Sequence, residues 1–131
     1  MSDPATRERP VSPYVTVWRW HIGMATSITN RIALFGVYAG VLILVGWLWS
    51  LASGRESYAA YTSLLATPVG VAVLVAISAG VFFSTGYKVR RLVMDLGHCY
   101  SPRASEFTGA AVFGFTIVAT IGFWAVVMMK V

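Results

Sequence analysis

Charged residues are scarce in this sequence. Of its 131 residues only 11% are charged, whereas 57% are hydrophobic, and the mean hydropathy is +0.71. A water-soluble domain carries about 25% charged residues. The chain therefore has too few polar side chains to cover a soluble globule, and its length is enough for one domain. This composition favours a membrane protein.

Cysteine and histidine are also scarce. The single cysteine, Cys99, excludes an internal disulfide and a cysteine-clustered metal site, and we interpret it as a bystander thiol. His21 and His98 lie 77 positions apart and outside the most apolar stretches, which favours surface or interfacial roles for both. The sequence has no dinucleotide fingerprint, phosphate loop or serine-nucleophile motif. The residues alone do not predict an enzyme complete in one chain.

Three long stretches contain no charged residue. They cover residues 32–54, 57–87 and 107–129. A helix needs about 20 apolar residues to cross the bilayer core, so each stretch can supply one span. We predict an all-α integral membrane protein with three transmembrane helices, at about residues 32–51, 63–87 and 107–129. Residues 1–131 then form a single membrane-anchor domain.

Positive charge is distributed unevenly around these spans. Eight of the ten basic residues precede the first span or lie between the second and third, and two lie on the other side: Arg7, Arg9, Arg19, Arg31, Lys88, Arg90, Arg91 and Arg103 against Arg55 and Lys130. Cytoplasmic loops are enriched in lysine and arginine. We therefore predict a cytoplasmic N-terminus, contact of the basic residues with lipid headgroups, and no binding of nucleic acid.

The segments next to the spans have their own patterns. Residues 15–31 are amphipathic and carry Trp18 and Trp20, whose rings suit the headgroup region. We predict that residues 1–31 are cytoplasmic or interfacial and that the amphipathic segment continues into the first span without a break. Residues 52–60 should form a short outer loop.

Proline, glycine and alanine indicate where the helices end and pack. Pro68 would cap or mildly kink the second span, and Gly97 would end it. Pairs of small residues four apart would allow another helix to approach closely. These pairs are Gly36 with Gly40 and Ala110 with Gly114.

Two polar clusters are candidates for function, because polar groups in or near a bilayer are costly. Ser27 and Arg31 are four apart and so share a helix face where the chain enters the membrane. Together they could donate hydrogen bonds to a carbonyl oxygen and stabilise negative charge on it. The alternative is an N-cap serine beside an arginine that reaches toward the headgroups.

The second cluster lies at the inner end of the second span. Ser84, Lys88, Arg91 and Asp95 are spaced by four, three and four, which places them on one helix face. Arg91 and Asp95 could pair along it. The alternative is an ordinary set of charges at the membrane edge, in which an exposed pair contributes about 0.3–0.5 kcal/mol.

The order of the motifs resembles the cytochrome b subunit of succinate dehydrogenase, the membrane-anchor subunit of complex II. The resemblance covers nearly the whole chain. Its motifs are Arg9-Pro10-x-Ser12-Pro13, Arg19-Trp20, Ser27-Ile28-x-x-Arg31 and Arg90-x-x-x-x-Asp95-x-Gly97.

The resemblance implies a subunit of a succinate:quinone oxidoreductase in a bacterial or mitochondrial inner membrane. Its partners would be a second hydrophobic anchor subunit, an iron–sulfur subunit and a flavoprotein subunit, and its substrate would be ubiquinone. The quinone-binding motif falls on Ser27, Ile28 and Arg31, with Arg91 and Asp95 as support from the second loop. The resemblance also implies heme b.

Three positions depart from the family pattern. Asn30 and Arg91 stand where the family usually has histidine, and Ser84 stands at the position of the axial haem ligand. A serine hydroxyl is a poor ligand for haem iron, so haem is lost, held through the partner's histidine alone, or bound through another ligand. We expect it to be lost or weakened.

These departures keep other functions open. A non-redox structural or assembly protein with the same three helices is the main alternative to the quinone-site subunit. A small transporter subunit is a third, although no charged residue lies deep within any predicted span.

Overall fold

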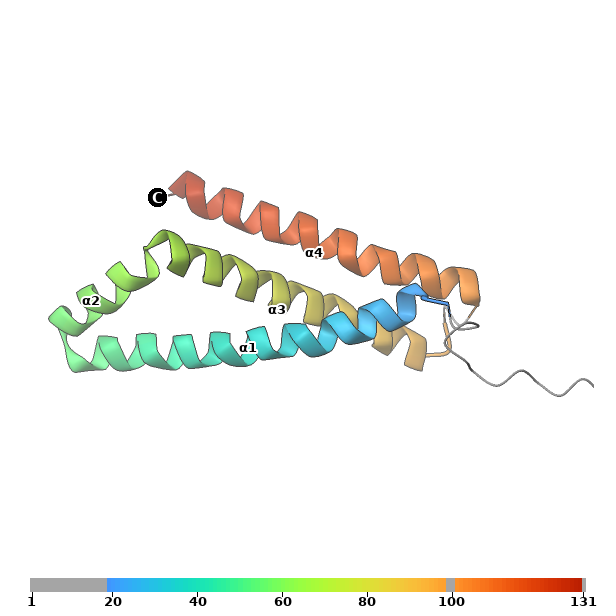
Figure 1. Cartoon of the computed structure of the whole chain (residues 1–131), viewed down its shortest axis with the longest axis horizontal. Helices are drawn as coiled ribbons and strands as arrows, with labels where there is room; N and C mark the ends of the chain where they lie inside the picture. Colours follow the sequence, from blue (N-terminus) through green and yellow to red (C-terminus); the bar gives the residue numbers. More distant parts are fainter. Residues whose placement is uncertain (1–18, 99–100, 131) are drawn as a thin grey trace, which may run out of the picture.

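The computed structural model describes residues 19–98 and 101–130, and within them all regular structure is helical (Figure 1). The helices are α1 (Ile22–Ser53), α2 (Arg55–Leu65), α3 (Pro68–Asp95) and α4 (Pro102–Lys130). At 1.5 Å per residue, α1, α3 and α4 are about 42–48 Å long, more than the roughly 30 Å core of a bilayer. All three are apolar enough to cross it. This confirms the prediction of an all-α membrane protein with three spans.

Helix α3 lies between α1 and α4, and each helix runs antiparallel to α3 (Figure 1). The start of α1, the end of α3 and the start of α4 come together at one end of the bundle, which we call the inner end (Figure 1). The described basic residues at these helix ends therefore lie at the same end of the bundle, whereas Arg55 begins α2 at the opposite end. This arrangement agrees with the predicted topology.

Helix α1 begins ten residues before the predicted start of the first span. His21 is its N-cap, and the Nδ1 atom of this residue accepts a hydrogen bond from the backbone N–H of Met24 at 3.3 Å. Residues 22–31 are thus the first turns of the spanning helix itself, in agreement with a segment that continues without a break. Trp18 and the rest of the predicted segment before residue 19 lie outside the described residues.

The outer connection differs from the predicted loop, because most of it is helix α2. Gly54, with φ of +117°, forms the corner between α1 and α2, a backbone conformation that glycine adopts readily. Helix α2 folds back on α1: the Tyr61 hydroxyl donates to the Ile43 carbonyl at 2.8 Å, and the Tyr58 ring packs edge-on against Trp47. The two tyrosines of α2 therefore cover part of the outer end of α1.

Helix α3 also has different ends from those predicted. It begins at Pro68 rather than near residue 63, since Pro68 occupies the first helical position, where its missing N–H costs nothing. Thr67 caps it by accepting from the Gly70 N–H at 3.1 Å. The helix continues past the predicted end at residue 87 to Asp95, and Gly97, with φ of +85°, follows its C-cap. Pro68 therefore caps rather than kinks the helix, and Gly97 stops it as predicted.

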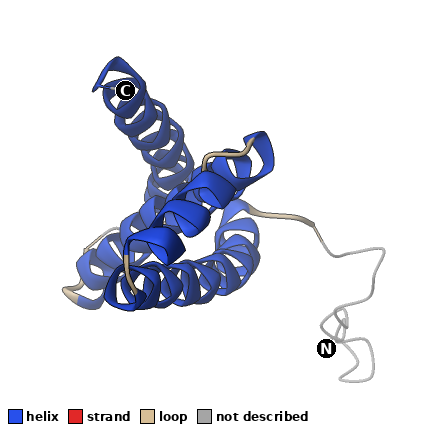
Figure 2. Ribbon diagram, turned by 90° about the vertical axis from the view of Figure 1, so that its left-hand side faces the viewer, coloured by secondary structure: helices blue, strands red, loops and turns tan. Residues whose placement is uncertain are grey.

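The buried side chains of the three long helices gather mainly at the inner end. Most large apolar side chains are exposed instead, as expected for helices that face lipid or other subunits. Toward its C-terminus α4 diverges from the other helices (Figure 2). The buried residues at the inner end are Thr26, Phe83, Ser84, Gly109 and Val112.

Two glycines outside the predicted small-residue pairs, Gly80 and Gly109, lie where helices pack closely. A methyl group on Gly80 would lie 3.2 Å from the carbonyl oxygen of Ala33, so the α1 and α3 backbones approach closely there. Gly109 is likewise buried against Ile22. Of the predicted pairs, Gly40 contacts α3, whereas Gly36 and Gly114 face open space within the described chain.

Candidate functional site

Ser27 and Arg31 lie on the same side of α1 near the inner end. Arg31 is exposed and Ser27 is partly buried. Because α1 begins at Ile22, Ser27 lies in its second turn, so the alternative that Ser27 caps the helix is wrong. Ile28 is 45% exposed beside them. The two donors can therefore reach a molecule that approaches α1 from outside this chain.

A shallow groove of about 300 Å³ continues from Arg31 along the same face. Its other lining residues are Leu34, Phe35 and Tyr38, all from α1. Neither α3 nor α4 contributes to its lining. The face therefore offers a guanidinium, a hydroxyl and apolar side chains together, but the opposite wall of any enclosed site has to come from another molecule.

Asn30 precedes Arg31 on α1 and points about 100° away from it around the helix. Its Oδ1 atom is buried and has no hydrogen-bond partner, and the same is true of Oγ of Ser84 on α3. Ser84 is only 3% exposed. The two positions that depart most from the family pattern are thus polar groups inside the bundle.

The four residues of the second cluster differ in burial along α3. Ser84 lies in the core, whereas Lys88, Arg91 and Asp95 are exposed on the last turns of α3. They therefore form a charged surface at the inner end and do not gather around Ser84. The support role of Arg91 and Asp95 stays a prediction.

Arg90 has a structural role that the sequence did not predict, because it is not part of the second cluster. Its Nε donates to the Thr108 hydroxyl at 3.0 Å, and its Nη2 donates to the Ser105 carbonyl and hydroxyl at 3.0 and 2.9 Å. These bonds join the end of α3 to the start of α4. The signal in the sequence was indirect: a partly buried arginine needs oxygen acceptors, and serine and threonine lie at the start of the third span.

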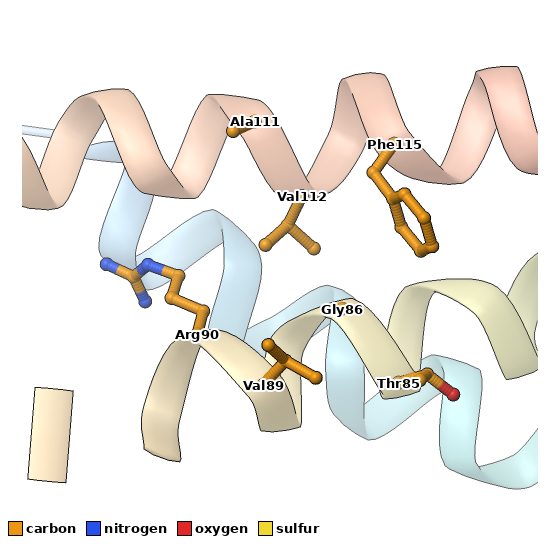
Figure 3. A pocket seen from close by; sticks show the side chains of 7 residues that line it. All are labelled: Thr85, Gly86, Val89, Arg90, Ala111, Val112 and Phe115. Atoms are coloured by element: carbon orange, nitrogen blue, oxygen red, sulfur yellow. The ribbon is translucent and has the colours of Figure 1, made fainter. Parts of the chain in front are cut away.

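Beside Arg90 lies an apolar hollow of about 380 Å³ between α3 and α4 (Figure 3). Val112 and Phe115 from α4 face Gly86 and Val89 from α3 across it (Figure 3). A second apolar hollow of about 540 Å³ lies between the outer halves of the same helices, with Phe82, Phe123 and Trp124 in its lining. Neither hollow brings together groups for catalysis.

The residues present do not fit the haem that the resemblance implies. The usual ligand is an imidazole, and position 84 holds a buried hydroxyl. His21 is exposed as the cap of α1, and His98 is exposed fourteen residues beyond Ser84, about 21 Å along a helix. The described residues also contain no group of three or more histidine, cysteine or acidic side chains that could hold a metal ion.

These features first define the class of protein to which the chain belongs. Three apolar helices cross the membrane, and a polar face of the first one is left uncovered at the inner end. The chain is therefore an integral membrane protein with three spanning helices.

The comparison with known proteins then defines the family. Residues 5–123 match the model of the succinate dehydrogenase/fumarate reductase transmembrane subunit, and the chain belongs to this family. The chain is similar to succinate dehydrogenase cytochrome b556 subunits from Rickettsia felis (27% identical, covering 89% of this chain and 91% of the relative) and Paracoccus denitrificans (23%, covering 92% and 94%). It is also similar to the mitochondrial cytochrome b560 subunit of Sus scrofa (27%, covering 87% and 69%). It is an integral inner-membrane protein.

Proposed function

We propose that the chain is the membrane-anchor subunit of a succinate:quinone oxidoreductase and that Ser27 and Arg31 contribute to the site of ubiquinone reduction. Electrons from succinate would reach this site through a flavoprotein subunit and an iron–sulfur subunit. The observation that carries the proposal is the pairing of a hydroxyl and a guanidinium on an uncovered face of α1.

The chemistry of quinone reduction suits these two groups. Two electrons and two protons convert a quinone to a quinol, and the ring oxygens gain negative charge before the protons arrive. Arg31 can stabilise that charge by a charge-assisted hydrogen bond, and Ser27 can donate a second one. Ile28 and Phe35 expose apolar surface on the same face, against which a quinone ring could pack.

The openness of the groove supports a shared site. All residues that line it come from α1, so this chain can hold one side of a quinone and leaves the other side to a partner. A second hydrophobic anchor subunit and the iron–sulfur subunit would complete it. We propose the same inner end for their docking, because quinone reduction requires an electron donor close to the ring.

The test of this function is substitution of Arg31 by alanine in the assembled complex. Loss of a hydrogen bond to a charged group costs about 1.5–3 kcal/mol, so Arg31→Ala should lower quinone reduction roughly 10- to 100-fold. Succinate oxidation measured with an artificial dye should persist, because it does not use this site. Arg55→Ala, which removes an exposed cation at the outer end, should leave both rates unchanged. Unaltered quinone reduction in Arg31→Ala would refute the assignment.

A structural or assembly protein of the same fold is the second candidate. It is favoured by Asn30, Ser84 and Arg91, which replace residues that the resemblance associates with redox function. Purification in mild detergent distinguishes the two. Co-isolation with flavin- and iron-bearing subunits supports the anchor, whereas isolation of the chain alone supports the structural role.

We also propose that this chain provides no axial imidazole to a haem. Electron transfer from an iron–sulfur cluster to a quinone at Arg31 does not require one. The quinone site can thus persist although position 84 holds serine.

A further inference from the structure

Among the residues that the structure describes, two buried side-chain oxygens at the inner end have no hydrogen-bond partner: Oδ1 of Asn30 and Oγ of Ser84. Serine and threonine in helices often donate back to their own helix, and the other two buried hydroxyls do so. Thr26 donates to the Gly23 carbonyl at 3.0 Å, and Ser50 donates to the Trp47 carbonyl at 2.7 Å. Ser84 is equally buried but makes no such bond. A buried hydroxyl is costly without a hydrogen bond, so Ser84 requires a partner.

The register of the two helices places Asn30 opposite Ser84. The close contact between Ala33 and Gly80 fixes which turns of α1 and α3 face each other. Asn30 lies three residues before Ala33 and Ser84 four residues after Gly80, which are steps of about 4.5 and 6 Å along the helices. Because the helices are antiparallel, both steps lead toward the inner end, and spacings of three and four keep the same helix face. The two oxygens therefore lie at nearly the same level of the α1–α3 interface.

We propose that Asn30 and Ser84 bind a water molecule between α1 and α3. The Ser84 hydroxyl would donate to the water, and the water would donate to Oδ1 of Asn30. Buried waters typically occupy such places, where polar groups of the protein lack other partners. A larger ligand is disfavoured, because Ser84 is 97% buried by this chain alone and Gly80 keeps the helix backbones in close contact one turn away.

The water site has a consequence for the neighbouring residue, which rests on the proposed function. Asn30 held against α3 fixes the rotation of α1 about its own axis. Arg31 follows directly in the sequence and is exposed. The buried water would thus act as a positioning element, because it helps to direct Arg31 and Ser27 toward the quinone rather than into the bundle.

Electron cryomicroscopy of the assembled complex, at a resolution that shows ordered waters, tests the site directly. We expect density for one water within hydrogen-bonding distance of both oxygens. A direct bond between Ser84 and Asn30, donation by Ser84 to its own helix, or a different molecule in this place would overturn the proposal.

A double-mutant cycle provides a second measurement, with the thermal midpoint of the complex as its readout. Ser84→Ala and Asn30→Leu should each lower the midpoint, and the double variant should fall by less than the sum because both remove the same water. Thr85→Val is the matched control: its hydroxyl is exposed and donates to the Val81 carbonyl at 2.8 Å, so it should combine additively with Asn30→Leu.

An additive result for Ser84→Ala with Asn30→Leu, or a midpoint that Ser84→Ala raises, would contradict a shared water. Both measurements are independent of quinone turnover. Failure of the Arg31→Ala experiment would therefore leave the water site intact, and failure of the water site would leave the quinone assignment intact.

Discussion

At the scale of single residues, two neighbours on α1 have opposite environments. The side-chain oxygen of Asn30 is buried, whereas Arg31 is exposed on the uncovered face. Consecutive residues of an α-helix point about 100° apart, so one short segment can contribute to the core and to a binding face at once. Its inner side belongs to the bundle, and its outer side is available to a quinone.

Ser27 provides a prediction at this scale. Ser27→Ala should lower quinone reduction roughly 3- to 10-fold, less than Arg31→Ala, because a neutral hydrogen bond contributes about 0.5–1.5 kcal/mol. Ser27→Thr keeps the hydroxyl and should retain most of the rate. Steady-state quinone reduction by the purified complex is the measurement, with the exposed outer residue Ser57 changed to alanine as the control. Equal losses in the alanine and threonine variants would show that the hydroxyl is not the contributing group.

The sequence predicted the Ser27–Arg31 face but not the burial of Ser84. A spacing of four is enough to place two residues on one side of a helix. Burial requires more, because α3 is apolar around its circumference near Ser84 and the pattern alone does not show which side meets another helix. That side is set by the Gly80–Ala33 contact between helices, which is not a local property of either segment.

At the scale of elements, Arg90 holds α3 and α4 together at the inner end. One guanidinium makes three hydrogen bonds to Thr108 and Ser105, all between 2.9 and 3.0 Å. The outer halves of the same helices are joined by a hydrogen bond from Trp124 Nε1 to the Ser78 hydroxyl at 2.9 Å. The spacing of these two helices thus depends on a few polar contacts between apolar surfaces.

Arg90→Lys should destabilise the protein, because an ammonium cannot reproduce the planar set of donors. The loss should be about 1–3 kcal/mol, given that hydrogen bonds to charged groups contribute roughly 1.5–3 kcal/mol and Arg90 is only partly buried. Thermal unfolding in detergent measures it. Arg91→Lys is a matched control, since Arg91 is the adjacent residue and is exposed. If both variants unfold at the same temperature, the contacts of Arg90 do not stabilise the helix pair.

The number of spans and the stop of α3 at Gly97 were predictable, whereas the starts of the three spanning helices were not. Uncharged stretches report where the bilayer core lies, but α1 and α3 continue beyond it into the headgroup region, where charged residues are tolerated. Helix α2 was missed for a related reason. It has eleven residues, begins with Arg55 and Glu56, and is held by contacts of Tyr58 and Tyr61 with α1.

At the scale of the whole molecule, the chain is a component rather than a complete unit. Its exposed apolar surface extends over all three spanning helices, and the polar face of α1 has one wall. The family and the membrane location could be predicted from motif order and charge. The surfaces of partner subunits could not be predicted, because this sequence does not contain the residues that would face the α1 groove from the other side.

The absorption spectrum of the purified complex tests the haem assignment. After reduction with dithionite we expect no b-type band of the kind given by iron between two imidazoles, because position 84 is a buried serine and both histidines are exposed at the ends of helices. A strong band of that kind would contradict this expectation. Quinone reduction should proceed whether or not the band is present. Measuring both therefore tests haem binding separately from the quinone site.

The close approach at Gly80 also bears on what a histidine introduced at position 84 would do to the bundle. An imidazole at position 84 would need space in an interior where the serine is only 3% exposed and the α1 and α3 backbones approach closely one turn away, and forcing extra atoms into a packed interior costs about 1–3 kcal/mol. Ser84→His alone should therefore destabilise the helix bundle, whether or not the imidazole binds iron.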